Sequence, residues 1–390
     1  MRGRYWLAGR RGRGALLDEF CAVTGFHRKA AIRALRRAPA ARGPQRRPAA
    51  AGHSAEVRAA LRTVWEAADR PCGKRLAPVL AELAEALERH GRLALDGATR
   101  ARLVGLSAAT IDRWLRPARL AVPRRPRTGT AATGGLAAEV AVRTFGEWGA
   151  VAPGEAQGDL VAHCGVTTEG FYLTTLTVVD VATGWLEVEP VWGKAQARVG
   201  GALDACRRRQ PVALRAFHTD NGGEFLNGVV APYCRRHAIR QTRGRPYKKN
   251  DQAWVEQRNW TAVRRLVGYG RLSSKAAHAQ LAALYAPLRL YFNFFQPLRK
   301  VIAKERVGGR VRKRYDHAAT PYRRLLAAGV LDDARRAALD AEYRALDPAA
   351  LLAEIHAALD ALRPLAEPDR GWSTALADRI PGVPPEAAAG

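Results

Sequence analysis

The sequence predicts an α/β core with a five-stranded mixed sheet, flanked by N-terminal helix-turn-helix domains and a C-terminal small β/helical region. Three observations support this architecture. Apolar residues recur at helical spacing through the first 117 residues. Three runs rich in β-branched and aromatic residues follow between 159 and 191, and strand-like and helical runs then alternate. Beyond 275 a helix precedes a Gly-Gly turn between two basic runs, which is typical of a hairpin.

The charge of the chain narrows the class of partner. The 390 residues include 64 Lys or Arg and 36 Asp or Glu, a formal net charge of +28. Such an excess favours a polyanion, and double-stranded DNA is the expected partner. A GC-rich genome would also raise the Arg content, but codon bias alone would not make bases so outnumber acids.

The cysteines and the apolar runs indicate the cellular compartment. Five Cys are scattered without a disulfide or zinc spacing, which favours a reducing cytosol. No apolar run approaches the length of a membrane span, and no secretory signal follows Met1. We therefore expect a cytoplasmic protein with no membrane partner, associated with the nucleoid when bound to DNA.

Residues 1–40 are predicted to form a basic N-terminal helix-turn-helix domain. The first fifty residues hold thirteen Lys or Arg and two acids. A short helix at 15–20, a turn at 24–27 and a basic helix at 28–37 give the pattern. An ordinary basic helical hairpin is the alternative. The DNA-contacting residues predicted on the second helix are Arg28, Lys29, Arg33, Arg36 and Arg37.

A linker at 41–54 leads to a second helical or helix-turn-helix domain at 55–117. Its last helix, 107–116, begins at the N-cap residue Ser107 and should end at Pro117. This helix could read DNA or could simply complete a helical bundle. A Pro/Arg-rich linker is expected at 118–137.

The core is predicted at 138–275. Its expected strands are 159–163, 171–179, 184–191, 214–219 and 239–242. Its expected helices are 194–208, 228–237 and 251–268. Three strands followed by alternating helices and strands indicate an antiparallel meander extended into a mixed sheet.

The C-terminal region divides by charge. Residues 276–330 should form a helix plus a basic β-hairpin region, with the hairpin between Val301 and Tyr315. Residues 331–390 contain six Arg and eleven acids and are predicted to be an acidic helical tail.

Three acids stand out by their surroundings. Asp159 lies on the first core strand, Asp220 ends the fourth, and Glu256 lies one turn into the last core helix. Carboxylates on adjacent strands with a third on a facing helix can hold two hard cations, which clamp a phosphodiester. The neighbouring stretch 225–250 contains seven Lys or Arg and no acid. Metal plus polyphosphate explains this combination better than solvated surface charge.

At these residues the sequence resembles the DDE transposase and retroviral-type integrase family, particularly bacterial insertion-sequence proteins. The match rests on Asp159, the Thr-Asp-Asn-Gly-Gly-Glu-Phe run ending at Phe225, Pro246-Tyr247, and Glu256, which is separated from Asp220 by thirty-five residues. The resemblance implies a ribonuclease H-like core. It also implies that Asp159, Asp220 and Glu256 are catalytic and bind two Mg²⁺ or Mn²⁺ ions.

The resemblance carries further expectations about DNA. It implies that Tyr247 and Gln252 approach a DNA end, and we expect a homo-oligomer on DNA. The basic loop 244–250 should be mobile without DNA and ordered with it, with Arg245, Lys248 and Lys249 near phosphates.

Several other residues are rivals for these roles. The rival acids are Glu224, which we interpret as structural or supporting, Asp180, which we interpret as turn chemistry, and Asp251. Cys234 and His237 have no second pair, so a zinc site is not expected, and the retroviral zinc motif is not found. His163-Cys164 is interpreted as strand packing.

The expected function is therefore that of a transposase or integrase. Such an enzyme would bind the ends of a mobile DNA element, hydrolyse a phosphodiester and transfer the freed 3′ end to target DNA. The alternatives are a non-catalytic DNA-binding protein derived from such an element and a plain ribonuclease H-like nuclease. The three acids argue against the first, and the two DNA-recognition modules argue against the second.

Overall fold

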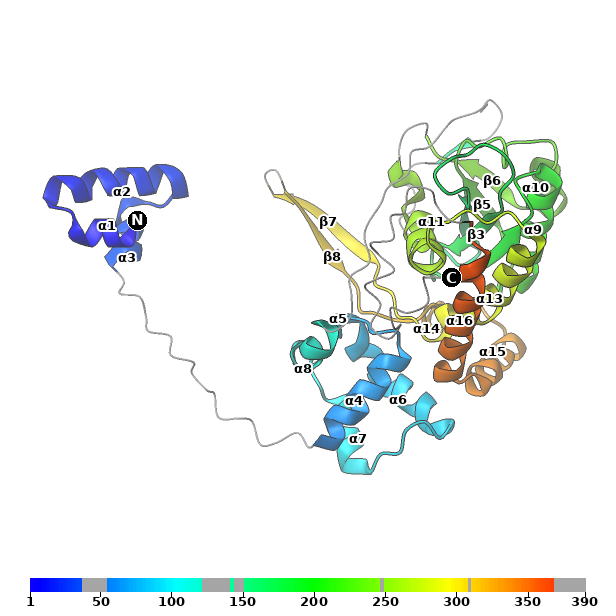
Figure 1. Ribbon diagram of the computed structural model, residues 1–390, viewed down its shortest axis with the longest axis horizontal. Helices are drawn as coiled ribbons and strands as arrows, with labels where there is room; N and C mark the ends of the chain where they lie inside the picture. The colour runs from blue at the N-terminus through cyan, green and yellow to red at the C-terminus, as the bar shows by residue number, and fades with distance from the viewer. Residues whose placement is uncertain (37–54, 121–140, 144–150, 246–248, 308–309, 368–390) are drawn as a thin grey trace, which may run out of the picture. The chain divides into compact units, whose positions relative to one another are not determined.

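The computed structural model describes residues 1–36, 55–120, 141–143, 151–245, 249–307 and 310–367. The chain forms two compact units, Met1–His53 and Ser54–Gly390, and each is described by itself (Figure 1). No described helix combines the length and apolar character needed to cross a lipid bilayer.

The first unit is a bundle of α1 (Arg2–Leu7), α2 (Arg10–Thr24) and α3 (Arg28–Arg36). Gly25 ends α2 with a φ of 70°, a left-handed conformation that favours glycine, and its N–H donates to the Cys21 carbonyl. The small core consists of Tyr5, Leu16, Leu17, Ala31 and Leu35. The helix expected at 15–20 is therefore only the middle of α2, and α1 was not predicted.

The second unit begins with a helical domain. Its elements are α4 (Ala55–Ala67), α5 (Gly73–Leu76), η1 (Ala77–Val79), α6 (Leu80–Arg89), α7 (Gly97–Val104) and α8 (Ala108–Leu120). Ser107 caps α8 as expected, because its Oγ accepts a hydrogen bond from the Thr110 N–H at 3.2 Å. The prediction that Pro117 ends this helix was wrong. Pro117 lies close to the C-terminal end of α8, and the helix continues to Leu120. The linker expected at 118–137 falls almost wholly outside the described residues.

The α/β core is built on a mixed sheet with the strand order β1-β6-β5-β2-β3-β4. Five strands match the expected ones: β2 (Glu155–Ala162), β3 (Thr174–Asp180), β4 (Leu186–Val191), β5 (Ala216–Thr219) and β6 (Arg240–Arg243). The two-residue β1 (Ala141–Val142) pairs with β6 at the edge. β2, β3 and β4 form an antiparallel meander, while β5 and β6 run parallel to β2.

Helices cover both faces of this sheet. One face packs against α9 (Gln196–Arg209) and α10 (Val230–Arg236) through a core that includes Leu176, Phe217 and Phe225. The other face packs against α11 (Ala253–Arg258) and α13 (Lys275–Phe294). All seven residues of β3 are buried, as expected for a strand that is covered on both sides.

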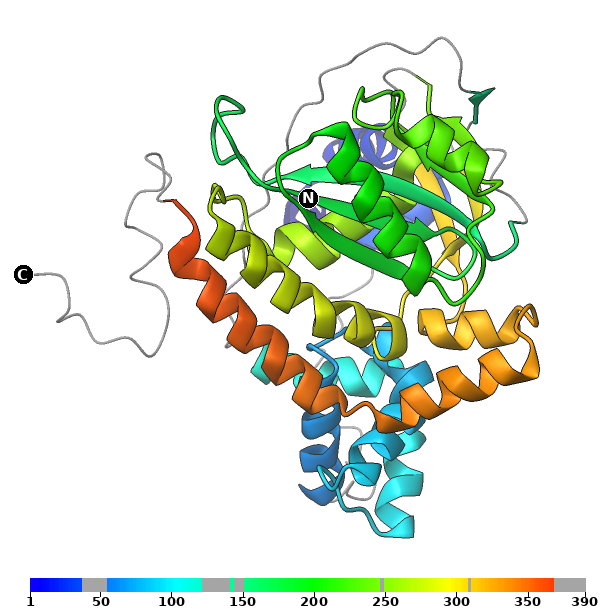
Figure 2. The ribbon, with the colours of Figure 1, turned by 90° about the vertical axis from the view of Figure 1, so that its right-hand side faces the viewer.

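Helix α13 also joins the core to the rest of the unit. It runs alongside α16 (Pro348–Leu362), as Figure 2 shows. The Tyr291 hydroxyl of α13 donates to the Ala67 carbonyl at 2.7 Å, which ties the helical domain to the core. Phe294 stacks with Tyr343 of α15 (Asp333–Ala345), next to α14 (Pro321–Ala327). The acidic segment thus contains the expected helices, and η5 (Arg363–Leu365) follows them.

A two-stranded hairpin lies between α13 and α14. Its strands are β7 (Val301–Val307) and β8 (Arg310–Tyr315), which match the expected arms. The Gly308-Gly309 turn lies outside the described residues.

Candidate active site

Asp159 and Asp220 lie on neighbouring parallel strands. The pairing of β2 with β5 places Gln157 opposite His218, and the same register continued by two residues places Asp159 beside Asp220. Adjacent strands lie about 4.8 Å apart, so the two carboxylates can share one site. Asp220 follows the last residue of β5, as predicted, whereas Asp159 lies within β2 and not at a strand end. β2 continues beyond β5 because β3 still pairs with it.

Glu256 comes from α11, which the buried Gln157 fastens to the sheet. The Gln157 Oε1 accepts hydrogen bonds from the backbone N–H groups of Trp254 and Val255, each at 3.2 Å. Its Nε2 donates to the Asp251 carbonyl at 2.8 Å. One fully buried side chain of β2 thus holds the start of the helix that carries Glu256.

The charges of Asp220 and, more weakly, Glu256 act on Asp159. Enclosure of the Asp159 carboxylate, followed by the charge of Asp220, raises the pKa of Asp159 to about 7, and Glu256 adds to this effect. Hydrogen bonds from the Leu160 N–H and Asn259 oppose the rise without cancelling it. Burial also raises the pKa of Asp220, although the Gly222 N–H donates to its Oδ1.

Asn259 is a member of the site that sequence reasoning missed. Its Nδ2 donates to the Asp159 Oδ2 at 2.6 Å. It lies three residues after Glu256, where the chain passes into the π-helix η4 (Asn259–Arg264), a form that often marks functional sites. Side chains three residues apart share a helix face, so the spacing from Glu256 was the available signal.

The donor set suits a divalent cation. Next to Asp159, the Asn259 Oδ1 is buried without a hydrogen-bond partner among the described residues. The same holds for the Oγ1 of Thr177, the cross-strand neighbour of Asp159. Crowded carboxylates and unsatisfied oxygens are the environment that hard cations prefer. In the described part of the chain, however, no three His, Cys, Asp or Glu side chains converge closely enough to hold one ion.

The structure gives other partners to two of the rival acids. The carboxylate of Asp251 binds Arg245 through both oxygens, at 2.9 and 3.0 Å. The Oδ1 of Asp180 accepts from the backbone N–H and hydroxyl of Thr183, so this acid organises the turn after β3, as interpreted. Glu224 lies in the loop after Asp220, with its carboxylate against Gly222.

The rival metal ligands also have structural roles. The Nε2 of His163 lies 2.7 Å from the Thr175 hydroxyl in the buried sheet, which agrees with strand packing. Cys234 is buried in α10, and the ring of His237 packs against Tyr233.

The basic loop before Glu256 is only partly described. Of the three cations expected near phosphates, only Arg245 has a described side chain. It forms an ion pair with Asp251, which balances its charge. Tyr247 and Lys248 lie outside the described residues, and only the backbone of Lys249 is described. Gln252 is buried, and its Nε2 lacks a hydrogen-bond partner among the described residues.

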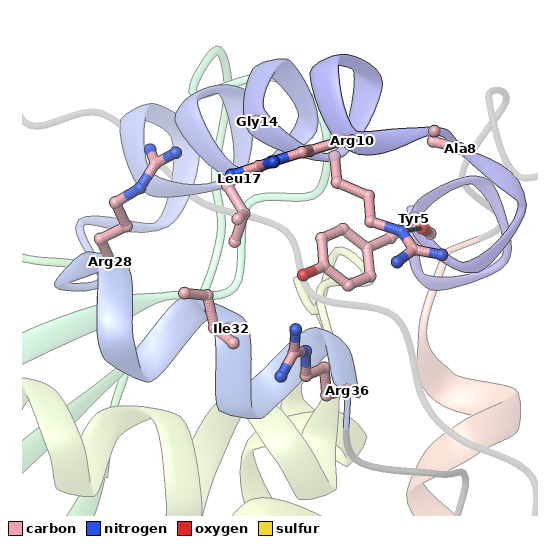
Figure 3. Close-up of a pocket in the computed structure, with 10 residues that line it drawn as sticks. Tyr5, Ala8, Arg10, Gly14, Leu17, Arg28, Ile32 and Arg36 are labelled. Atoms are coloured by element: carbon pink, nitrogen blue, oxygen red, sulfur yellow. Dashed lines mark hydrogen bonds between the residues drawn. The ribbon is translucent and has the colours of Figure 1, made fainter.

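The N-terminal unit contains a basic hollow of its own, with a volume of about 510 Å³ (Figure 3). Tyr5 and Leu17 lie between α2 and α3, and the arginines around them are Arg10, Arg13, Arg28 and Arg36. Of the predicted DNA contacts, Lys29, Arg33 and Arg36 are exposed, and Arg28 is exposed but paired with Asp18. Arg37 lies outside the described residues.

The chain is similar in sequence and in fold to known proteins. Residues 152–249 match the family model of the integrase core domain, a span that includes Asp159 and Asp220 and ends before Glu256. The uncharacterised protein y4rM of Sinorhizobium fredii is 44% identical over 321 residues, which cover 82% of this chain and 91% of that protein. The crystal structure of the BIV integrase catalytic core domain is 18% identical, with a TM-score of 0.28, and the match covers 45% of this chain and 95% of that one.

Proposed function

The chain belongs to the DDE-type integrase and transposase family, and on this premise we propose that it cuts and joins DNA at the ends of a mobile element. The observation that carries the proposal is the shared register of Asp159 and Asp220, next to the start of the helix that contains Glu256, which Gln157 of the same strand holds by its backbone. Mutual repulsion among these carboxylates is costly unless cations bind between them.

Asp159, Asp220 and Glu256 are the residues that would hold two Mg²⁺ or Mn²⁺ ions. Such ions activate water or a 3′-hydroxyl and stabilise charge on the phosphodiester. The protein orients the carboxylates. The Leu160 N–H and the Asn259 amide fix the two oxygens of Asp159, and the Gly222 N–H fixes one oxygen of Asp220. Oxygens held in this way need little rearrangement during the reaction.

The DNA would be held by basic surfaces outside the triad. The exposed cations of α3, Lys29, Arg33 and Arg36, are placed to contact phosphates of the element end. The loop that contains Lys248 and Lys249 precedes the helix that carries Glu256, so DNA bound there would lie beside the carboxylates. Cutting and joining two ends requires two active sites, which is why we propose a homo-oligomer on DNA.

The test compares two conservative acid substitutions with a matched control. Asp220→Asn and Glu256→Gln should each abolish Mg²⁺-dependent cleavage of element-end DNA and leave the affinity for that DNA largely unchanged, because each removes only a cation-binding charge. Glu169→Gln removes an exposed acidic charge from the same domain and should retain activity. If cleavage by Asp220→Asn or Glu256→Gln is near normal, that residue is removed from the triad.

The second candidate is a non-catalytic DNA-binding protein derived from such an element. It predicts that the wild-type chain binds DNA, that no tested divalent metal supports cleavage, and that the triad substitutions have no effect. The pairing of Asp159 with Asp220 speaks against this candidate, because a DNA-binding protein has no need of adjacent carboxylates that repel one another.

A further inference from the structure

The β7–β8 hairpin is poorly supported by the rest of its unit. Its strands form their own two-stranded sheet, and neither makes an extensive contact with another described element. Figure 1 shows the hairpin projecting from the body of the second unit. Val301, Ile302 and Tyr315 are exposed, with Ile302 at 55%. An isolated two-stranded hairpin is only marginally stable in water, so a free arm of this kind suggests a partner.

The charge of the hairpin indicates the chemistry of that partner. Four of the six residues in β8 are basic and none is acidic. The register places Glu305 opposite Arg312, whereas Lys313 and Arg314 have no acid opposite them. The exposed side chains Arg312, Lys313 and Arg314 follow one another, so cations alternate between the two faces of the ribbon. A polyanion long enough to surround both faces would relieve the repulsion among these cations.

The root of the hairpin is fixed firmly to the core. The Lys300 Nζ donates to the carbonyls of Val181 and Ala182, at 2.7 and 2.8 Å, in the turn between β3 and β4. In the same turn, the Gly184 carbonyl accepts from the Arg258 Nη2 at 3.0 Å. Arg258 lies two residues after Glu256 on α11. The turn therefore connects the root of the hairpin to the helix that carries a catalytic acid.

We propose that the β7–β8 hairpin is a DNA-binding arm that inserts into a groove of the duplex, with Arg312, Lys313 and Arg314 on the phosphates. A two-stranded ribbon is narrow enough for the major groove of B-form DNA. Because the root contacts the turn that binds α11, DNA on the arm is held in a fixed relation to Glu256. This inference rests on the proposed function, since it assumes that DNA is the substrate.

The experiment measures binding of a short random-sequence duplex by fluorescence anisotropy over a range of salt concentrations. The arm variant is R312Q/K313Q/R314Q, and the matched control is R335Q/R336Q/R344Q, which removes three exposed cations from α15. Loss of two to three phosphate contacts should lower the salt slope by about 2 to 3 and weaken binding roughly 30- to 100-fold at 0.15 M salt. The control should bind like the wild-type chain.

Additional variants and measurements separate the possible outcomes. A thermal melt checks that the arm variant is folded, and the charge-conserving R312K/R314K should keep the wild-type salt slope. If the arm variant binds like the control, the inference is overturned while the proposed function stands. If the wild-type chain binds no duplex, the proposed function itself fails. If the arm variant binds DNA normally but no longer self-associates in sedimentation, the arm binds a second copy of the chain, and the inference is again overturned.

Discussion

Asp159→Asn should stabilise the protein while destroying its activity. The carboxylate of Asp159 is enclosed and crowded by two other acids, which raises its pKa to about 7. A neutral amide of the same shape removes this repulsion. It can accept from the Leu160 N–H and, once the Asn259 amide rotates, donate to the unsatisfied Asn259 Oδ1. The substitution therefore exchanges one unsatisfied atom of Asn259 for another, and the expected gain comes from the repulsion that is removed.

The magnitude follows from the rise in the pKa of Asp159 from its ordinary value of 3.8 to about 7. At about 1.36 kcal/mol for each pKa unit, this rise corresponds to roughly 4 kcal/mol of lost stability when Asp159 is fully ionised. Because Asp159 keeps some solvent exposure, we expect about 2 to 4 kcal/mol, or roughly 4 to 8 °C in Tm.

The pH dependence of this effect has a definite sign. Between about pH 4 and pH 7 the folded protein holds a proton that the unfolded chain has released, so the wild-type stability falls as the pH rises through this window. The Asn variant lacks this loss. The difference in Tm between the two proteins should therefore be largest at pH 8 and fall to roughly one third at pH 5.

The assay is a thermal melt in EDTA at both pH values, with Asp251→Asn as the matched control. Asp251 is more deeply buried than Asp159, but Arg245 compensates its charge, so the control should lose about 1 to 3 kcal/mol. Adding Mg²⁺ should raise the Tm of the wild-type protein and not that of Asp159→Asn. If Asp159→Asn melts at or below the wild-type temperature at pH 8 in EDTA, the reasoning about charge crowding is refuted.

Three further predictions follow from other parts of the chain. Gly158→Ala should lower the free energy of unfolding by about 1 to 3 kcal/mol and slow cleavage, because the added Cβ would lie 2.3 Å from the buried Phe217 ring and β2 would have to shift. Unchanged activity and Tm would show that the sheet adapts. Lys248→Glu with Lys249→Glu should slow strand transfer far more than it lowers Tm, since like charges repel DNA phosphates; strand transfer at the wild-type rate would show that the two lysines do not contact DNA. A chain lacking residues 1–50, which belong to a separate compact unit, should lose end-specific binding in a gel shift and keep metal-dependent nicking; retained end specificity would move recognition to residues 55–116.

The sequence predicted the sheet well because strand patterns are local. Alternation and β-branched runs located five strands of the mixed sheet but not the two-residue β1, and the outer ends of the hairpin arms matched. The contacts that organise the site were not predictable in this way. Gln157 and Asn259 act on partners about a hundred residues away in the chain. The stretch 225–250 contains no acid that could balance the charge of Arg245, because its partner Asp251 lies one residue beyond that stretch.

The third acid poses a physical problem that the first two do not. The register of β2 and β5 sets the separation of Asp159 and Asp220, whereas Glu256 lies on a short helix whose backbone is not part of the sheet. Its position therefore depends on side-chain contacts along its segment. Gln157 of β2 holds the start of α11, Arg258 at the end of α11 binds the Gly184 carbonyl, and Asn259 immediately after it binds Asp159. The Arg258 contact is the one that also involves the turn at the root of the hairpin. DNA bound at the hairpin would therefore act on the segment that contains Glu256, and if Glu256 has the proposed role, cleavage would be favoured only when DNA occupies the arm.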